Sequence, residues 1–188
     1  MPAKITVTQY ISLDGVIEDP VGMENSGLGD WTGPYSRGPE GDRFKHEELM
    51  NADAMIYGRR TYDGFAAVWP TIENEFADRM NALPKYLAST TVGAPGWQNT
   101  SLLAPDLIPA VETLRARLDG TILIYGSASI CHALFRAGLI DAVTLMIYPV
   151  ALGRGIRLFP NETPCRLSLT HSQTFDDGIQ LLQYETTR

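Results

Sequence analysis

Residues 122–129 read Ile-Leu-Ile-Tyr-Gly-Ser-Ala-Ser, a short apolar run that meets a glycine and small hydroxyl residues. Successive residues of a strand point to opposite faces, so a continuous apolar run indicates a strand that is covered on both sides. The residues that follow predict a helix ending at Gly138, since glycine commonly terminates helices. This strand, turn and helix are typical of an α/β sheet with parallel strands.

The same alternation continues on both sides of this unit. The sequence predicts strands at 4–13, 54–57, 85–88, 142–150, 167–175 and 179–184, and helices at 40–51, 61–68 and 73–83 and from Asp106 onward. Asp177-Gly178 separates the last two strands and is a strong hairpin signal. We therefore expect an open, mostly parallel α/β sheet flanked by helices, with an antiparallel C-terminal edge hairpin. No linker or repeat divides the chain, which predicts one domain over residues 1–188.

The composition excludes several classes of protein. The 188 residues carry 15 Lys and Arg against 22 Asp and Glu, a net charge of −7, and the basic residues form no cluster. Nucleic acid is therefore not an expected partner. No apolar stretch approaches the ~18 residues of a membrane helix, so we expect no membrane span and a cytoplasmic protein.

Metal binding is not expected either. His46 and Glu48 fit half of a zinc-deaminase signature, and Pro164-Cys165 begins the other half, but Ser168 stands where a second cysteine would be required. Cys131 and Cys165 are too few for a cysteine-rich zinc site and indicate no disulfide framework.

Three predicted strand ends carry glycine, arginine or hydroxyl residues, at 58–61, 89–91 and 126–129. In an open α/β sheet, ligands bind beside the carboxyl ends of the strands. The third segment leads into a helix N-terminus, which favours an anion. Arg59 and Arg60 could pair with surface acids, but beside Ser89-Thr90 they would also suit a 2′-phosphate. Together the segments predict a phosphate-rich cofactor.

Six short motifs occur in an order that is similar to a known family. They are Ser12-Leu13-Asp14-Gly15, Gly58-Arg59-Arg60-Thr61-Tyr62, Pro84-Lys85 through Ser89-Thr90, Ile124-Tyr125-Gly126-Ser127-Ala128, Gly138-Leu139-Ile140-Asp141 and Pro149-Val150-x-Leu152-Gly153-x-Gly155 to Phe159. From about residue 5 to residue 184, the chain resembles the dihydrofolate-reductase-like family. That family includes the C-terminal reductase domain of the riboflavin-pathway deaminase-reductase.

The resemblance implies NADPH as the cofactor. The implied cofactor-binding residues are Arg59, Arg60, Thr61, Ser89, Thr90, Gly126, Ser127, Ala128 and Ser129. One departure is that the family's run of glycines is Gly-Ser-Ala here. The long segment 12–31 corresponds to the family's mobile loop, and its implied lid residues are Asp14, Gly15 and Trp31.

The resemblance further implies a reductase that transfers hydride to a small pterin-like or pyrimidine/ribosylamine-type heterocycle. Asp42 matches the family's substrate-orienting carboxylate, although a carboxylate in an early helical turn also suits the helix dipole. Tyr10 and Tyr125 lie at strand ends, where we expect the acceptor. Two alternatives stay open: a non-catalytic NADP-binding sensor or interaction module, and a reductase of a flavin-like or other non-pterin substrate. A homodimer is also implied.

Overall fold

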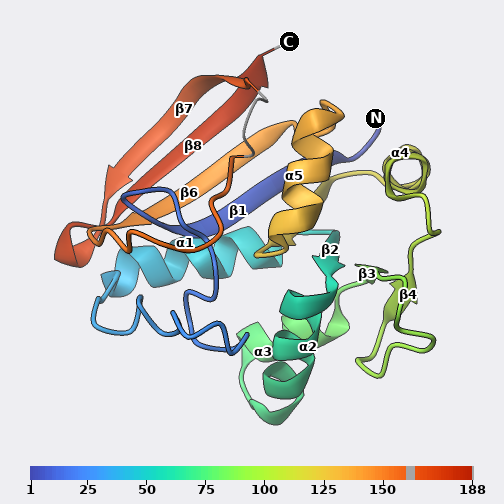
Figure 1. Cartoon of the computed structure of the whole chain (residues 1–188), viewed down its shortest axis with the longest axis horizontal. Helices are drawn as coiled ribbons and strands as arrows, with labels where there is room; N and C mark the ends of the chain where they lie inside the picture. The colour runs from blue at the N-terminus through green and yellow to red at the C-terminus, as the bar shows by residue number, and fades with distance from the viewer. Residues whose placement is uncertain (160–163, 188) are drawn as a thin grey trace.

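A computed structural model describes residues 1–159 and 164–187; residues 160–163 and 188 of the predicted 1–188 domain lie outside the described residues. One eight-stranded sheet crosses the molecule in the order β4-β3-β2-β5-β1-β6-β8-β7 (Figure 1). Its strands are β1 (Lys4–Ser12), β2 (Ala54–Gly58), β3 (Lys85–Ala88), β4 (Thr100–Leu102), β5 (Thr121–Tyr125), β6 (Ala142–Tyr148), β7 (Arg166–Thr174) and β8 (Gln180–Thr187).

The pairing of the strands confirms the predicted fold class. The strands from β4 to β6 pair in parallel, whereas β8 is antiparallel to both β6 and β7. A short 3₁₀ turn, η2 (Asp176–Gly178), joins β7 to β8. Asp177 and Gly178 have φ angles of 52° and 75°, the left-handed conformation that Asp-Gly favours in a hairpin.

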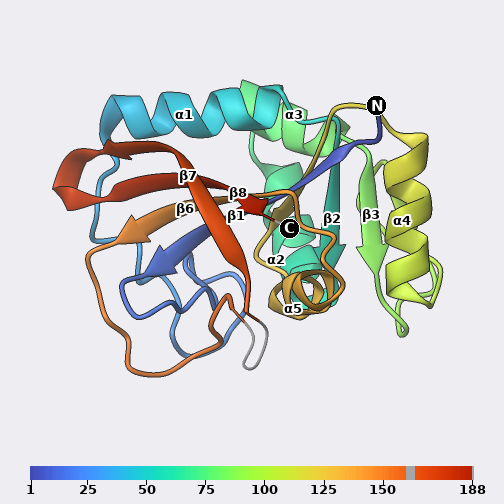
Figure 2. The ribbon, with the colours of Figure 1, turned by 90° about the horizontal axis from the view of Figure 1, so that it is seen from above.

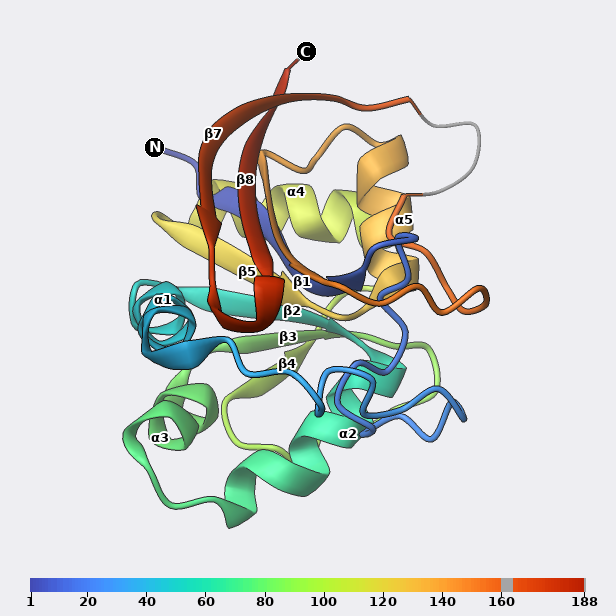
Figure 3. The same cartoon turned by 90° about the vertical axis from the view of Figure 1, so that its left-hand side faces the viewer.

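Helices cover both faces of the sheet (Figures 2 and 3). They are α1 (Gly38–Met50), α2 (Arg59–Val68), α3 (Glu75–Ala82), α4 (Leu107–Arg117) and α5 (Ala128–Arg136), with a 3₁₀ turn η1 (Trp69–Thr71) after α2. Strand β5 shows how the layers form. Ile122 and Ile124 belong to the core under α4 and α5, whereas Leu123 and Tyr125 belong to the core under α1, α2 and α3. The two-sided apolar run of β5 is therefore needed by both layers.

Two details differ from the pattern in the sequence. Strand β4 was not expected, because its three residues are too short and too polar to show alternation. Leu13 follows the apolar parity of β1, yet its exposed fraction is 71%, because β1 ends at Ser12 and the chain turns away. Among the described residues, no helix is long and apolar enough to cross a membrane.

Candidate active site

A cavity of about 750 Å³ opens beside the carboxyl ends of β1 and β5, between the sheet, α1, α2 and the segment from residue 19 to residue 37. Its polar lining residues include Thr8, Gln9, Tyr10, Asp19, Glu24, Arg37, Asp42, Lys45, Thr61 and Tyr125, and its apolar ones include Val21, Met23, Phe65, Trp69, Ile72, Phe76 and Tyr148. Apolar walls with a few convergent polar groups are typical of small-molecule sites.

The turn after β5 is fixed from inside the sheet. The buried Gln9 side chain donates from Nε2 to the Gly126 carbonyl (2.8 Å) and accepts from the Gly126 N–H (3.1 Å). Gly126 has a φ of +53°, and a Cβ built there would lie 2.6 Å from Thr61 Oγ1. Only glycine lets this turn approach the first turn of α2 so closely.

Ser127 stands where the resembled family has a glycine, and the structure shows how a serine is accommodated there. Its φ of 54° is the left-handed conformation, which is costly for a residue with a side chain. Three hydrogen bonds hold it: its N–H donates to Thr61 Oγ1 (2.9 Å), its hydroxyl donates to the Tyr125 carbonyl (2.9 Å), and that hydroxyl accepts from the Gly58 N–H (3.0 Å). Ser127 thus joins the ends of β2 and β5.

The start of α5 offers two backbone donors. Within residues 1–159 and 164–187, no hydrogen-bond acceptor is found for the N–H groups of Ala128 and Ser129. Unpaired N–H groups in a first helical turn favour an anion through both hydrogen bonding and the helix dipole. The predicted phosphate contact of these residues therefore fits their local geometry.

Arg59 lies beside the turn after β3. Its guanidinium donates to Thr91 Oγ1 (2.6 Å) and to the Asp63 carboxylate (2.6 Å). Ser89 Oγ in turn accepts from the N–H groups of Thr91 and Val92 (both 3.2 Å), which closes the turn around Thr90. The structure therefore brings Arg59 together with the hydroxyl-rich turn at 89–91, although Thr91 rather than Thr90 contacts it.

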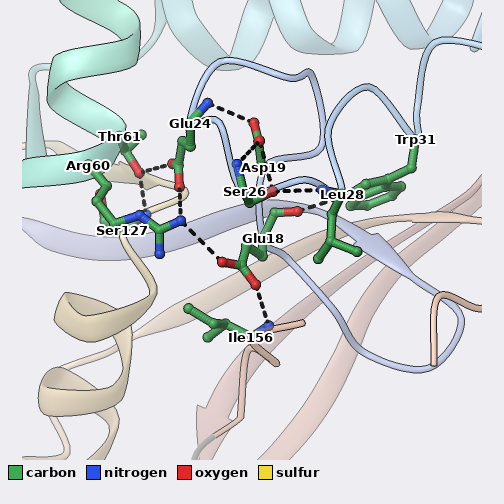
Figure 4. Close-up of polar contacts among 10 residues, drawn as sticks. All are labelled: Glu18, Asp19, Glu24, Ser26, Leu28, Trp31, Arg60, Thr61, Ser127 and Ile156. Atoms are coloured by element: carbon green, nitrogen blue, oxygen red, sulfur yellow. Dashed lines mark hydrogen bonds and ion pairs between the residues drawn. The ribbon is translucent and has the colours of Figure 1, made fainter. Parts of the chain in front are cut away.

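The segment between β1 and α1 contains a compact loop built on Asp19. This buried carboxylate accepts from the N–H groups of Glu24 (2.8 Å) and Ser26 (3.0 Å) and from the Ser26 hydroxyl (2.9 Å) (Figure 4). Burial opposes ionisation of Asp19, but these hydrogen bonds outweigh it and lower its pKa. The loop rests directly on α2, because a Cβ on Gly64 would lie 2.7 Å from the Met23 carbonyl oxygen.

Two carboxylates of this loop contact predicted cofactor residues. Glu24 accepts a hydrogen bond from Thr61 Oγ1 (2.7 Å) and lies 3.7 Å from the Arg60 guanidinium, which also pairs with Glu18 (3.1 Å) (Figure 4). Both glutamate side chains are only 15% exposed. Sequence reasoning missed these two acids, since nothing local in the sequence says which cation they meet.

The three lid residues implied by the resemblance lie at the two ends of the segment and do not line the cavity. Asp14 accepts from the N–H groups of Leu152 (3.0 Å) and Gly153 (2.8 Å), next to Gly15. Hydrogen bonds from Ser12 and from those two N–H groups lower its pKa to about 2. Trp31 is buried and donates from its indole to the Glu18 carbonyl (2.9 Å). These residues anchor the segment, whereas residues 19–24 reach the cavity.

Helix α1 forms the opposite wall with Asp42, and Tyr10 of β1 and Tyr125 of β5 line the same cavity. Asp42 accepts a hydrogen bond from Arg37 Nε (2.6 Å), and its side chain is 67% exposed, which places it at the rim. Arg37 also donates to the Tyr10 hydroxyl. Asp42 is thus already paired with a cation on one of its oxygens.

Deeper in this wall is an ion pair that sequence reasoning missed. Lys45 and Glu48 are bonded side chains with exposed fractions of 8% and 9%. The Tyr125 hydroxyl donates to the same Glu48 oxygen (3.1 Å). The sequence contains only a weak signal for this burial, because the buried stripe Gly38, Gly41, Lys45 and Leu49 contains a single large apolar residue.

No metal centre is formed by the described residues, none of whose His, Cys, Asp and Glu side chains form a suitable group of three. His46 instead lies 3.2 Å from the Glu75 carboxylate. The expectation that the protein holds no metal stays a prediction.

Residues 3–181 match the model of the RibD C-terminal domain family. The chain belongs to the RibD C-terminal domain family. Among curated proteins it is similar to the uncharacterized protein YyaP of Bacillus subtilis (strain 168), with 26% identity over 96% of this chain and 94% of that protein. The resemblance found in the motifs is thereby confirmed.

Solved structures support the same fold for this RibD C-terminal domain protein. A putative riboflavin biosynthesis protein from Shewanella sp. PV-4 superposes with a TM-score of 0.74 and 20% identity, covering all of both chains. Dihydrofolate reductase from Enterococcus faecalis, solved with NADP(H), superposes with a TM-score of 0.62 and 10% identity over 98% of this chain and 97% of that one. At these identities the likeness establishes the fold.

Proposed function

We propose that this protein is an NADPH-dependent reductase that transfers hydride to a small pterin-like or pyrimidine/ribosylamine-type heterocycle. The observation that carries the proposal is the convergence of three phosphate-suited segments. Two of them line one largely apolar cavity through Thr61 and Gly126, while the third contacts Arg59 through Thr91. Membership of the RibD C-terminal domain family and the likeness to a dihydrofolate reductase solved with NADP(H) support it.

The residues at the strand ends fit the phosphates of NADPH. Arg59 and the 89–91 turn would hold the 2′-phosphate, because guanidinium and hydroxyl donors suit it. The N–H groups of Ala128 and Ser129, with Arg60, Thr61 and Ser127 nearby, would hold the pyrophosphate beside Gly126. Bound there, NADPH supplies a hydride, and the protein must orient the acceptor and exclude water.

The remaining roles fall to the cavity walls. Asp42 at the rim would orient the acceptor, while the Tyr10 and Tyr125 rings would flank it. The loop built on Asp19 would cover the reacting groups. In the structure described, its carboxylates Glu18 and Glu24 sit against Arg60 and Thr61. The cofactor's phosphates would have to replace these carboxylates, so the loop must shift when NADPH binds.

The test is to titrate NADPH into the protein, following the fluorescence of its three tryptophans, and then to add acceptors. The acceptor set contains a dihydropterin, a ribosylaminopyrimidine and an oxidised flavin, with nicotinamide absorbance as the readout. We expect NADPH to bind and at least one acceptor to be reduced. Absence of NADPH binding contradicts the proposal. Binding without turnover of any acceptor favours the sensor function, and reduction of flavin alone favours the non-pterin reductase.

Two expectations accompany the proposed function. A homodimer is implied by the family resemblance, and light scattering of the purified protein tests it. A cytoplasmic location is expected from the sequence, and fractionation of the native cells tests it.

A further inference from the structure

The protein has three lysines, and two of them, Lys45 and Lys85, are buried. Lys85 is fully used by the fold: its ammonium donates to the carbonyls of Met80 (2.9 Å), Asn81 (2.8 Å) and Leu83 (2.8 Å). An ammonium has three protons, and here each finds a backbone acceptor. Lys85 therefore has a complete structural role.

Lys45 is bonded differently. Among the described residues, its ammonium has one hydrogen-bond acceptor, the Glu48 carboxylate. Its other close neighbours are aromatic faces, with Nζ 4.4 Å from the Tyr125 ring centroid and 5.5 Å from that of Tyr10. Aromatic faces attract a cation but leave its N–H groups without a hydrogen-bond acceptor. Because Lys45 also lines the cavity, donor capacity remains on the cavity side of this wall.

The carboxylates of the same wall, Asp42 and Glu48, already accept hydrogen bonds from other residues of the protein. Asp42 accepts from Arg37, and one Glu48 oxygen accepts from both Lys45 and Tyr125. The other Glu48 oxygen is buried and has no hydrogen-bond partner in the part of the chain that the structure describes, and Glu48 is not among the residues that line the cavity. The second Asp42 oxygen stays an acceptor at the exposed rim, whereas deeper in the cavity the unused hydrogen-bonding capacity of this charged cluster is that of the Lys45 donor.

We propose that Lys45 is an acceptor-binding residue, and that it selects a planar unsaturated compound carrying a carbonyl or anionic oxygen. Glu48 and Tyr125 act as positioning residues, since they hold the ammonium between the two tyrosine rings. The aromatic and apolar walls, among them Phe65 and Trp69, suit the flat part of such a compound.

Lys45 would also donate a proton to the acceptor during the reduction, and this second role rests on the proposed function. With NADPH bound as the hydride donor, a carbonyl of the acceptor, or a double bond conjugated to one, would be reduced at carbon. The electron pair of that double bond would move to the carbonyl oxygen, which would take a proton from Lys45 Nζ. The neutral amine then regains a proton from solvent. Burial lowers the pKa of Lys45, which eases loss of this proton, while Glu48 opposes the shift.

The binding role can be tested without cofactor or turnover. With lysine labelled at Nζ with ¹⁵N, the protein gives three side-chain signals, from Lys4, Lys45 and Lys85. Benzoate and benzamidine are the probes, because they share a shape and differ in presenting anionic oxygens or a cationic amidinium. We expect benzoate to shift the Lys45 signal and to leave that of Lys85 unchanged, and benzamidine to shift neither.

Variants complete the test. Lys45→Met alone would leave Glu48 buried without its cation, so the main variant is the double change Lys45→Met/Glu48→Gln, which removes both charges. We expect it to fold and to bind benzoate about tenfold or more weakly, the loss of one charge-assisted hydrogen bond. Lys45→Arg, which keeps the charge, should retain part of the binding. The signal that the double variant lacks also identifies Lys45.

The inference is overturned if benzoate leaves the Lys45 signal in place, if benzamidine binds better, or if the double variant keeps the affinity of the wild type. These outcomes are independent of the proposed function, which fails instead if NADPH does not bind. Benzoate binding at Lys45 without NADPH binding would contradict only the reductase function. NADPH binding without an effect of benzoate would contradict only the inference.

Discussion

Replacing Arg59 by alanine should reduce the preference of the protein for NADPH over NADH. The Arg59 guanidinium contacts the 89–91 turn through Thr91, and among the described residues it bonds to side chains and to no backbone group. Because NADH lacks the 2′-phosphate, the variant should bind NADH almost as the wild type does. The wild type should prefer NADPH, and the variant should lose most of that preference.

The size of the loss in selectivity depends on how exposed the Arg59 guanidinium is to solvent where it would meet the 2′-phosphate. A hydrogen bond to a charged group contributes ~1.5–3 kcal/mol where it is shielded from solvent. Arg59 is 47% exposed and shares its guanidinium with Asp63, so solvent screening and competition reduce the contribution. An effect of about 1–1.5 kcal/mol remains, which corresponds to a loss of roughly 5- to 12-fold in selectivity.

The assay is a pair of tryptophan-fluorescence titrations, with NADPH and with NADH, at fixed ionic strength near 0.1 M, where charges are screened beyond ~10 Å. Arg43→Ala is the matched control, because it removes the same charge from a different place. The Arg43 side chain is 65% exposed on α1 and forms ion pairs of 3.9 Å with Glu40 and Glu47. The reasoning is refuted if Arg59→Ala weakens both nucleotides equally, if Arg43→Ala has the same effect, or if the wild type binds both nucleotides alike.

Two further predictions concern the segment between β1 and α1. Glu24→Gln should tighten NADPH binding about tenfold, because the phosphates would no longer compete with a charged acceptor at Thr61. The control is Glu112→Gln, since Glu112 is exposed. Unchanged or weaker NADPH binding by Glu24→Gln contradicts the prediction. Asp14 has a pKa of about 2 in the folded protein against 3.8 ordinarily, so its contribution to stability is present above pH 3.8 and is lost as the pH falls toward 2. The melting temperature of the wild type should therefore fall more between pH 4.5 and pH 2 than that of Asp14→Asn, and parallel curves would contradict this.

The elements that sequence could predict are those whose cause is local. The apolar run at 122–125 and the Asp177-Gly178 turn carry their structure in adjacent residues, and both occur as predicted. The meeting of the strand ends follows from geometry, because the carboxyl ends of neighbouring parallel strands lie at the same edge. This is why Thr61 and Gly126, which are distant in sequence, could be expected at one site.

What sequence could not predict depends on distant partners. Glu48 and Tyr125 are 77 positions apart, and nothing near either residue indicates their hydrogen bond. The burial of Lys45 depends on the side of α1 that meets the sheet, which a weakly amphipathic helix leaves open. Glu24 is an unremarkable acid in a loop until the fold places it against Thr61.

The two ends of the cavity differ in how ready they are for a ligand. At the end proposed for the cofactor, Arg60 and Thr61 already contact carboxylates of the loop, so a phosphate bound to these two residues would replace Glu18 and Glu24. At the end proposed for the acceptor, the ammonium of Lys45 is held by Glu48 and faces the cavity, and within residues 1–159 and 164–187 no carbonyl accepts from it. Under the proposed function, the cofactor would therefore shift the loop as it binds, whereas the wall of α1 would receive an acceptor as it stands. Under the same proposal, this loop both admits the cofactor and covers the reacting groups, and helix α1 positions the acceptor.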